Sequence, residues 1–219
     1  MLDNLLLCIK EQRSFMQIKK ENTRQKILAI ARDEFIMNGF RNTSMRIIAY
    51  KSGITLSNIY TYFHNKDEIF RAVLSGVFAA IDQLMEEHNK AESIDLYIMN
   101  AHDYVKSQID FFVNLVTNYK EDFNLLLFKA SGSSLENFRD QFIDKHSAIG
   151  NEYFLKVKNK YPKVNIEVSS FFIHTMSSWS ISVIAELVSH DLSREEIEQF
   201  MSEYLAFGTA GWRKIMNLQ

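Results

Sequence analysis

Apolar residues recur at every third or fourth position along most of the chain, which is the spacing of helices that bury one face. The first clear case runs over residues 22–38, where Ile27, Ala31 and Phe35 share one side and Gly39 suits a left-handed end. Two short helices should begin near residues 43 and 55. Longer helices are predicted at residues 65–88, 94–118, 120–130, 134–160, 165–189 and 194–217.

Chain-breaking residues are scarce, which excludes folds that need many turns. The 219 residues include 7 glycines and 1 proline, and Pro162 falls between two predicted helices. Ser133 with Glu136, and Ser193 with Glu196, have the spacing of capping boxes that begin helices. We therefore predict an all-α fold.

A helix-turn-helix is predicted from the spacing of three residue types. Such a unit needs a small residue where its helices cross, a turn residue that tolerates positive φ, and an apolar anchor on the second helix. Ala49, Gly53 and Ile59 meet these needs at intervals of four and six positions. Ile48 and Ile54 supply apolar bulk between the two helices.

Charge is divided unevenly along the chain. Residues 16–66 hold nine Lys or Arg against three acids, an excess of six, whereas the net charge of −2 leaves −8 for the rest. A basic N-terminal part on an acidic remainder indicates a polyanionic partner for that part. For the charge alone, chance variation on a solvated surface is the alternative. Combined with a helix-turn-helix, the excess indicates double-stranded DNA.

Several classes of function lack the residues they need. The single cysteine, Cys8, excludes an intramolecular disulfide framework and a cysteine-rich zinc site. No run of about 18–20 apolar residues indicates a membrane span, so we expect a cytoplasmic protein. His102, His146 and His174 lack the spacing of a helical metal site, and no Ser-His-Asp or Cys-His arrangement is recognisable. We expect neither an enzyme nor a cofactor.

Several spaced elements agree together within residues 21–71, namely Thr23-Arg24-Gln25-Lys26-Ile27-Leu28, Phe35, Gly39-Phe40, Thr43-Ser44-Met45-Arg46-Ile47-Ile48-Ala49, Ser52-Gly53-Ile54, Ile59-Tyr60-Thr61-Tyr62-Phe63 and Lys66-Asp67-Glu68-Ile69-Phe70. With these elements, the region resembles the N-terminal domain of the tetracycline-repressor (TetR) family. The resemblance implies a helix-turn-helix DNA-binding domain over 21–67 and a helical dimerisation and ligand-binding domain over 68–219. Residues 1–20 are expected to be an extension, disordered or outside the natural start, with a genuine basic arm as the alternative.

The resemblance and the side-chain chemistry together predict the DNA contacts. Thr43, Arg46 and Lys66 are expected to bind phosphates, Lys66 from a helix N-terminus whose dipole favours an anion. Asn58 can pair with adenine, and Leu56 can rest on a thymine methyl. The predicted DNA contacts are Thr43, Arg46, Thr55, Leu56, Ser57, Asn58, Tyr60, Thr61, Tyr62, His64 and Lys66.

Three of these residues have an alternative interpretation. Tyr60 could pack between helices, and Tyr62 and His64 could lie at the surface without a contact.

The resemblance also implies that the C-terminal helices form a homodimer and enclose a pocket for a small-molecule inducer. Serines among apolar residues over 165–189 would let two helices approach closely. The predicted dimer contacts are Ser178, Ile184, Phe200 and Tyr204. The predicted pocket residues, for which plain core packing is the alternative, are Tyr104, Phe112, Phe128, Phe142, His146, Phe172, Met176 and Trp179.

These observations predict a sequence-specific DNA-binding transcriptional regulator, a repressor that a small, largely apolar ligand releases from its operator. In the alternative, the C-terminal domain only dimerises or senses a protein partner. An unrelated helical enzyme is the third possibility.

Overall fold

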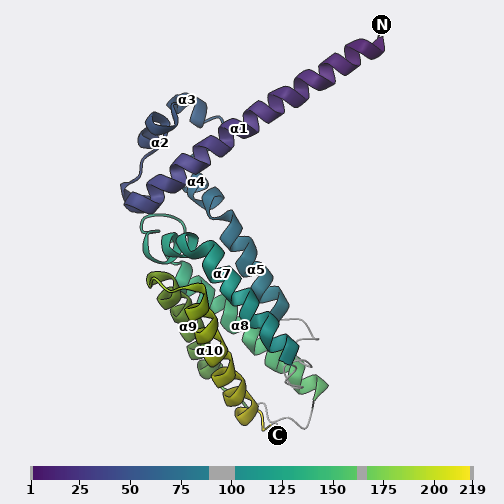
Figure 1. Cartoon of the computed structure of the whole chain (residues 1–219), viewed down its shortest axis with the longest axis vertical. Helices are drawn as coiled ribbons and strands as arrows, with labels where there is room; N and C mark the ends of the chain where they lie inside the picture. The colour runs from purple at the N-terminus through teal and green to yellow at the C-terminus, as the bar shows by residue number, and fades with distance from the viewer. Residues whose placement is uncertain (1, 89–101, 162–166, 218–219) are drawn as a thin grey trace. The chain divides into compact units, whose positions relative to one another are not determined.

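The computed structural model describes the backbone of residues 2–88, 102–161 and 167–217, and side chains at 17–86, 105–161 and 167–217. Over these ranges the chain forms helices and no strand, which confirms the all-α prediction (Figure 1). The helices are α1 (Leu2–Asn42), α2 (Met45–Ser52), α3 (Leu56–Ile59), α4 (Lys66–Val73), α5 (Ser75–His88), α7 (His102–Phe128), α8 (Phe138–Lys160), α9 (Ser170–Ser189) and α10 (Arg194–Ile215).

The chain divides into two compact units, and the division does not follow the sequence in a single cut. The first unit contains Met1–Ser75 together with Lys129–Ser134, and the second contains Gly76–Phe128 and Leu135–Gln219. We call the first unit the head and the second the body. The sequence predicted a boundary after residue 67 and no return of the chain to the head.

Three aromatic rings form the centre of the head. Phe35 from α1 and Phe70 from α4 meet edge to face with ring centroids 4.9 Å apart, and Phe40 lies 5.1 Å from Phe70. Phe35 and Phe70 are fully buried, as are Ile48 of α2 and Ile59 of α3. Burial of these side chains fixes the short helices, which are too short to be stable alone.

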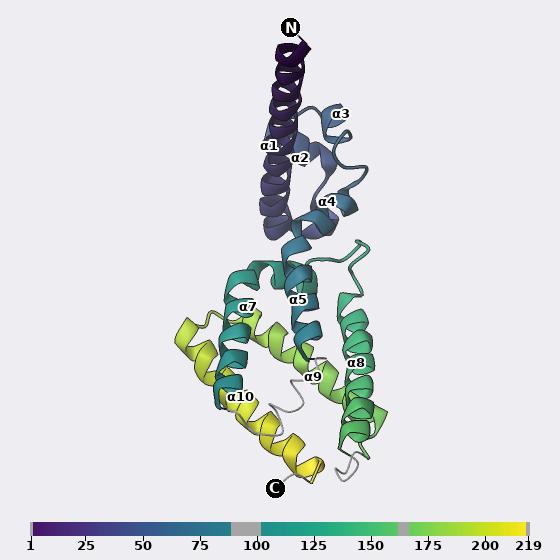
Figure 2. The same cartoon turned by 90° about the vertical axis from the view of Figure 1, so that its right-hand side faces the viewer.

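Helices α5 and α7 to α10 form the body, in which α9 packs against α7 and α8, and α10 packs against α7 (Figure 2). Helices α8 and α9 contact each other at Gly150, where an added Cβ would lie 2.8 Å from Ile173 Cγ2. At the N-terminus of α10, Ser193 and Glu196 form the predicted capping box.

Several helix boundaries differ from the prediction. Helix α1 begins at Leu2, so residues predicted as an extension have helical backbone. The helix predicted over 65–88 is divided at Leu74 (φ −89°, ψ 4°). The break between predicted helices at residue 119 is present as non-helical backbone at Tyr119 inside α7. Residues 94–101 and 165–166 lie outside the described ranges.

Helix α9 carries more apolar surface than its own unit buries. By length and composition alone it could cross a membrane, and 33% of its most apolar stretch is buried. The sequence prediction, which counted continuous apolar residues, missed this because serines interrupt the apolar positions. An apolar helix face that the described residues of its own subunit leave uncovered is typical of a protein contact.

Candidate nucleic-acid interface

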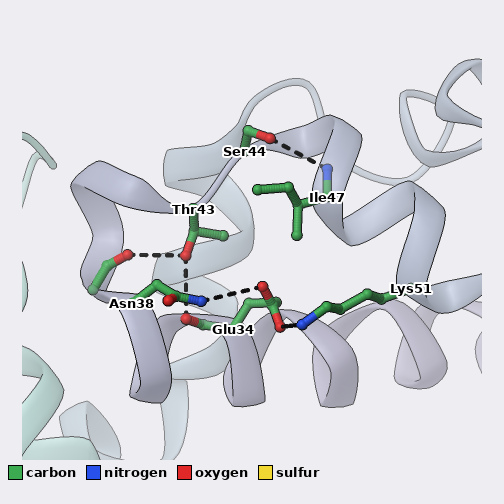
Figure 3. A network of polar contacts seen from close by, with 7 residues as sticks. Glu34, Asn38, Thr43, Ser44, Ile47 and Lys51 are labelled. Carbon is green, nitrogen blue, oxygen red and sulfur yellow. Dashed lines mark hydrogen bonds and ion pairs between the residues drawn. The ribbon is translucent and has the colours of Figure 1, made fainter.

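The start of α2 differs from the prediction by one residue. Thr43 is 2% exposed, and its hydroxyl donates to Gly39 O at 2.9 Å, with Glu34 O at 3.2 Å (Figure 3). Ser44 caps α2 instead, its Oγ accepting from Ile47 N at 3.2 Å. The predicted phosphate contact by the Thr43 hydroxyl is therefore replaced by an internal bond, and the half-buried Ser44 is the hydroxyl at this helix N-terminus. Adjacent hydroxyl residues gave no signal to choose between them.

The turn and the second helix of the unit have the predicted form. Gly53 has φ 66°, ψ 21°, a left-handed conformation that residues with a Cβ rarely adopt. Thr55 caps α3 by accepting from Asn58 N at 3.4 Å, and the fully buried Ile59 anchors α3 in the head. Helix α3 therefore exposes its first turn because its last residue is fixed inside.

The exposed face of this unit carries most of the predicted contacts. Arg46 projects from α2 without a hydrogen-bond or ionic partner among the described residues, while Thr61 Oγ1 donates to Asn58 O at 2.7 Å. Tyr60 is 48% exposed, which argues against its packing between helices. Exposed side chains on this face are Arg46, Thr55, Ser57, Asn58, Tyr60, Thr61 and His64, and Leu56 and Tyr62 are half-buried.

Lys66, predicted to bind a phosphate, is engaged inside the head. Its Nζ donates to Phe40 O at 2.5 Å and to Thr43 O at 2.7 Å, and lies 4.0 Å from the centroid of the Phe40 ring. Burial lowers the pKa of this ammonium group. These carbonyls lie at and beyond the end of α1, where backbone acceptors lack helical partners. The structure thus gives Lys66 an internal role in place of the predicted one.

Lys66→Met should lower the free energy of unfolding of the head by about 1–3 kcal/mol, because two carbonyls lose a charged donor. The slope of DNA affinity against salt should stay unchanged. Denaturant unfolding and binding titrations at several salt concentrations measure the two effects. If the variant is stable and the slope of log affinity against log salt concentration falls by about one, Lys66 contacts a phosphate, as the sequence predicted.

Lys129–Ser134 is a segment of the head that comes between two helices of the body in sequence, and we call it the docked segment. At its start, Phe40 N donates to Lys129 O at 2.9 Å, and Lys129 Nζ donates to Ile36 O at 2.5 Å. Lys129 therefore satisfies one donor and one acceptor near the end of α1. The bond to Phe40 sits next to Gly39, whose φ of 73° turns the backbone out of the helix.

The end of the docked segment is bound to α4. Asp67 accepts from both Ser134 N and Ser134 Oγ, each at 2.7 Å, and Arg71 Nη1 donates to Ser134 Oγ at 3.3 Å. No helix begins at the predicted capping box: Ser133 Oγ donates to Ala130 O at 2.6 Å, and residues 134–137 form turns. Helix α8 begins later than predicted, at Phe138, and Ser134, the predicted first helical residue, is bound to Asp67 instead.

The predicted pocket residues lie at several places in the body. Phe142 is 4% exposed and stacks on His146, whose Nδ1 is 3.0 Å from Ser177 Oγ. Phe172 meets Trp212 edge to face. The ring of Phe112 contacts that of Phe111, and Met176 is half-buried. Phe128 is 53% exposed, and Trp179 lies on the outer face of α9. The side chain of Tyr104 lies outside the described ranges. Core packing accounts for the contacts of Phe142.

An apolar groove of about 360 Å³ lies between the outer faces of α9 and α10. Trp179 stands 4.9 Å from the ring of Tyr204 and 5.9 Å from that of Phe207, measured between centroids. The predicted dimer residues Phe200 and Tyr204 line it, whereas Ile184 is 5% exposed and faces its own core. Ser178 is half-buried. The groove residues are Trp179, Ser182, Val183, Glu186, Phe200, Tyr204 and Phe207.

Within the part of the chain that is described, no group of three His, Cys, Asp or Glu residues could hold a metal ion.

Residues 27–73 match the family of bacterial regulatory proteins called tetR. An uncharacterised HTH-type transcriptional regulator of Haemophilus influenzae is 23% identical over 191 residues, which is 86% of this chain and 87% of the relative. YdgC, an uncharacterised HTH-type transcriptional regulator of Bacillus subtilis, is 30% identical over 71 residues, 32% of this chain and 36% of the relative.

Solved structures share the fold at low identity. NalD, the secondary repressor of the MexAB-OprM multidrug efflux pump in Pseudomonas aeruginosa, has a TM-score of 0.60 at 18% identity and covers 87% of this chain and 96% of its own. The transcriptional regulator FadR of Bacillus subtilis in complex with stearoyl-CoA has a TM-score of 0.51 at 15% identity, over 83% of this chain and 96% of its own.

Proposed function

Because the chain belongs to the tetR family of bacterial regulatory proteins, we propose that it is a cytoplasmic repressor that a small, largely apolar ligand releases from its operator. Members of the family are DNA-binding transcriptional regulators. The observation that carries the proposal for this chain is the exposed first turn of α3, together with the exposed Arg46, which has no hydrogen-bond or ionic partner among the described residues. A short helix turn can enter the major groove while flanking cations contact the backbone.

Arg46→Ala and Asn58→Ala should weaken DNA binding in different ways. Arg46→Ala should lower affinity for every sequence alike and flatten the salt slope by about one, since a neutralised phosphate no longer releases its counterion. Asn58→Ala should cost roughly 1–3 kcal/mol at one operator position if a bidentate base contact is lost. Fluorescence anisotropy with a selected operator and with random DNA separates the two.

Unchanged affinity and salt slope in Arg46→Ala would place the DNA elsewhere on the head. Equal losses on operator and random DNA for Asn58→Ala would make Asn58 a backbone contact. Met37→Ala, at a side chain 74% exposed on α1, serves as the control and should change neither measurement.

The groove between α9 and α10 supports a homodimer. Four aromatic side chains and Val183 line it, and Phe207 is 69% exposed in the single chain. A second copy of the chain, related to the first by a two-fold axis, would cover these side chains. Each subunit would then contribute the same patch to the interface. Such a dimer would present two heads to half-sites about 34–36 Å apart on DNA.

Release by a ligand is supported by the docked segment. Phe128 ends α7 in the body, and the next six residues are bound to the head before the chain returns to the body at Leu135. A ligand that moves the end of α7 or the start of α8 would therefore pull on Asp67 and on the end of α1. In this arrangement, ligand binding changes the position of the head, and no chemical reaction is needed.

Asp67→Ala should separate ligand binding from DNA release. We expect a compound from a panel of small apolar and amphipathic molecules to raise the melting temperature of the wild type and to lower its operator affinity. In Asp67→Ala the same compound should still raise the melting temperature, whereas its effect on operator affinity should shrink by at least about fivefold.

Asp33→Ala is the matched control, since this exposed acid on α1 has no hydrogen-bond or ionic partner among the described residues. Its response to the compound should equal that of the wild type. Undiminished release in Asp67→Ala would remove the docked segment from the mechanism. A panel without any stabilising compound would favour the second function, a C-terminal domain that only dimerises or senses a protein partner.

A further inference from the structure

A buried carboxylate connects the first two helices of the head. Glu34 belongs to α1, and its side chain is 3% exposed. Its Oε1 forms an ion pair with Lys51 Nζ from the last turn of α2, and its Oε2 accepts from Asn38 Nδ2 at 3.3 Å (Figure 3). Each carboxylate oxygen has a donor, which a charge this deeply buried requires.

Lys51 is placed where it can control the direction of α3. It lies two residues before Gly53, and the turn after it is held by Ile54 N donating to Ala49 O at 3.2 Å. Helix α3 has four residues, so its orientation depends on the turn and on α2. A displacement of the end of α2 on α1 is therefore passed to the first turn of α3.

Apolar packing alone would hold α2 less strictly. Ile48 and Ala49 bury apolar surface against the head, but burial of this kind has no direction and tolerates small slides. An ion pair with a second donor on the other oxygen has one favourable geometry. The pair of Glu34 and Lys51 thus selects one register of α2 on α1.

We propose that Glu34 and Lys51 are positioning residues for operator reading, which act through α2 on the base-contacting turn of α3, and that Lys51 makes no phosphate contact. This inference rests on the proposed DNA-binding function. Of the nine Lys and Arg in residues 16–66, at most seven then remain to contact DNA, because Lys51 is paired with Glu34 and Lys66 is bound to backbone carbonyls.

Lys51→Met, Glu34→Gln and the double variant Glu34→Met with Lys51→Met test the proposal. The operator is first selected from random-sequence DNA with the wild-type protein. Affinities for the operator and for random DNA are then measured at several salt concentrations, well below the melting temperature of each variant.

The two single variants should lose about tenfold in the ratio of operator to random affinity, comparable to one spoiled base contact. Their affinity for random DNA and their salt slope should stay at wild-type values. The double variant leaves no buried charge unpaired, so it should regain melting temperature but not the affinity ratio. Lys26→Met, which removes an exposed positive charge of α1, should leave the ratio unchanged.

Two results would overturn the proposal. A Lys51→Met protein that loses affinity for both DNAs alike, with a salt slope lower by about one, would make Lys51 a phosphate contact. A double variant with the wild-type affinity ratio would reduce the pair to a stabilising role. A wild-type protein that prefers no DNA sequence would instead refute the proposed function, which is a distinguishable outcome.

Discussion

Phe207→Glu should convert the proposed dimer into monomers and lower operator affinity by about a hundredfold or more, because one head alone lacks the gain from a linked second site. The substitution puts a carboxylate into an apolar groove that a second subunit would seal from water. Phe207 is 69% exposed in the single chain, so the folded subunit should lose little stability. Sedimentation velocity and operator titrations measure the two effects.

Leu155→Glu is the matched control for this prediction. Leu155 is 63% exposed on α8 and does not line the groove between α9 and α10. This variant should sediment as the wild type does and bind the operator with unchanged affinity. If Phe207→Glu still sediments as a dimer, the interface lies on another surface and the apolar face of α9 needs a different partner.

Phe70→Ala should unfold the head while the body stays helical. The ring is fully buried between Phe35 and Phe40, and a cavity of this size costs about 3–5 kcal/mol, much of the stability of a small domain. Calorimetry of Phe70→Ala should show two unfolding transitions. The transition of the head should occur at a lower temperature than in the wild type, whereas that of the body should stay in place. Operator binding should be lost at the temperature where the head is unfolded.

Met37→Ala shortens a side chain of α1 that is 74% exposed, and it should leave both transitions in place. A single transition that shifts as a whole in Phe70→Ala would contradict the prediction. That result would mean that the head and body unfold as one cooperative unit despite their separate cores.

The helix-turn-helix could be predicted because its signals are local and agree with one another. Ala49, Gly53 and Ile59 act within eleven residues, and the structure places all three as the spacing requires. The capping box at Ser193 is equally local and is also present. Where two neighbours can serve the same purpose, as with Thr43 and Ser44, local patterns do not decide which side chain turns inward.

The interior contacts that connect distant parts of the chain could not be predicted. Asp67 and Ser134 are 67 positions apart, and nothing in either neighbourhood indicates that they bond. The sequence predicted Lys66 as a phosphate ligand. Its bonds to Phe40 O and Thr43 O could not be predicted, because the positions of these carbonyls depend on the finished fold. The pocket residues stay a prediction for another reason, since aromatic spacing on a helix is the same whether the rings line a cavity or fill a core.

The return of the chain to the head at Lys129–Ser134 limits how the gene can recombine. An exchange of DNA-binding domains between two relatives, cut after Ser75, would transfer Phe40 and Asp67 and leave Lys129 and Ser134 with the other parent. In such a hybrid, the new head would meet a segment 129–134 that had not been selected to bind it. New operator specificities should therefore be acquired more readily by substitutions in the first turn of α3 than by exchange of whole domains, unless residues 129–134 move with them.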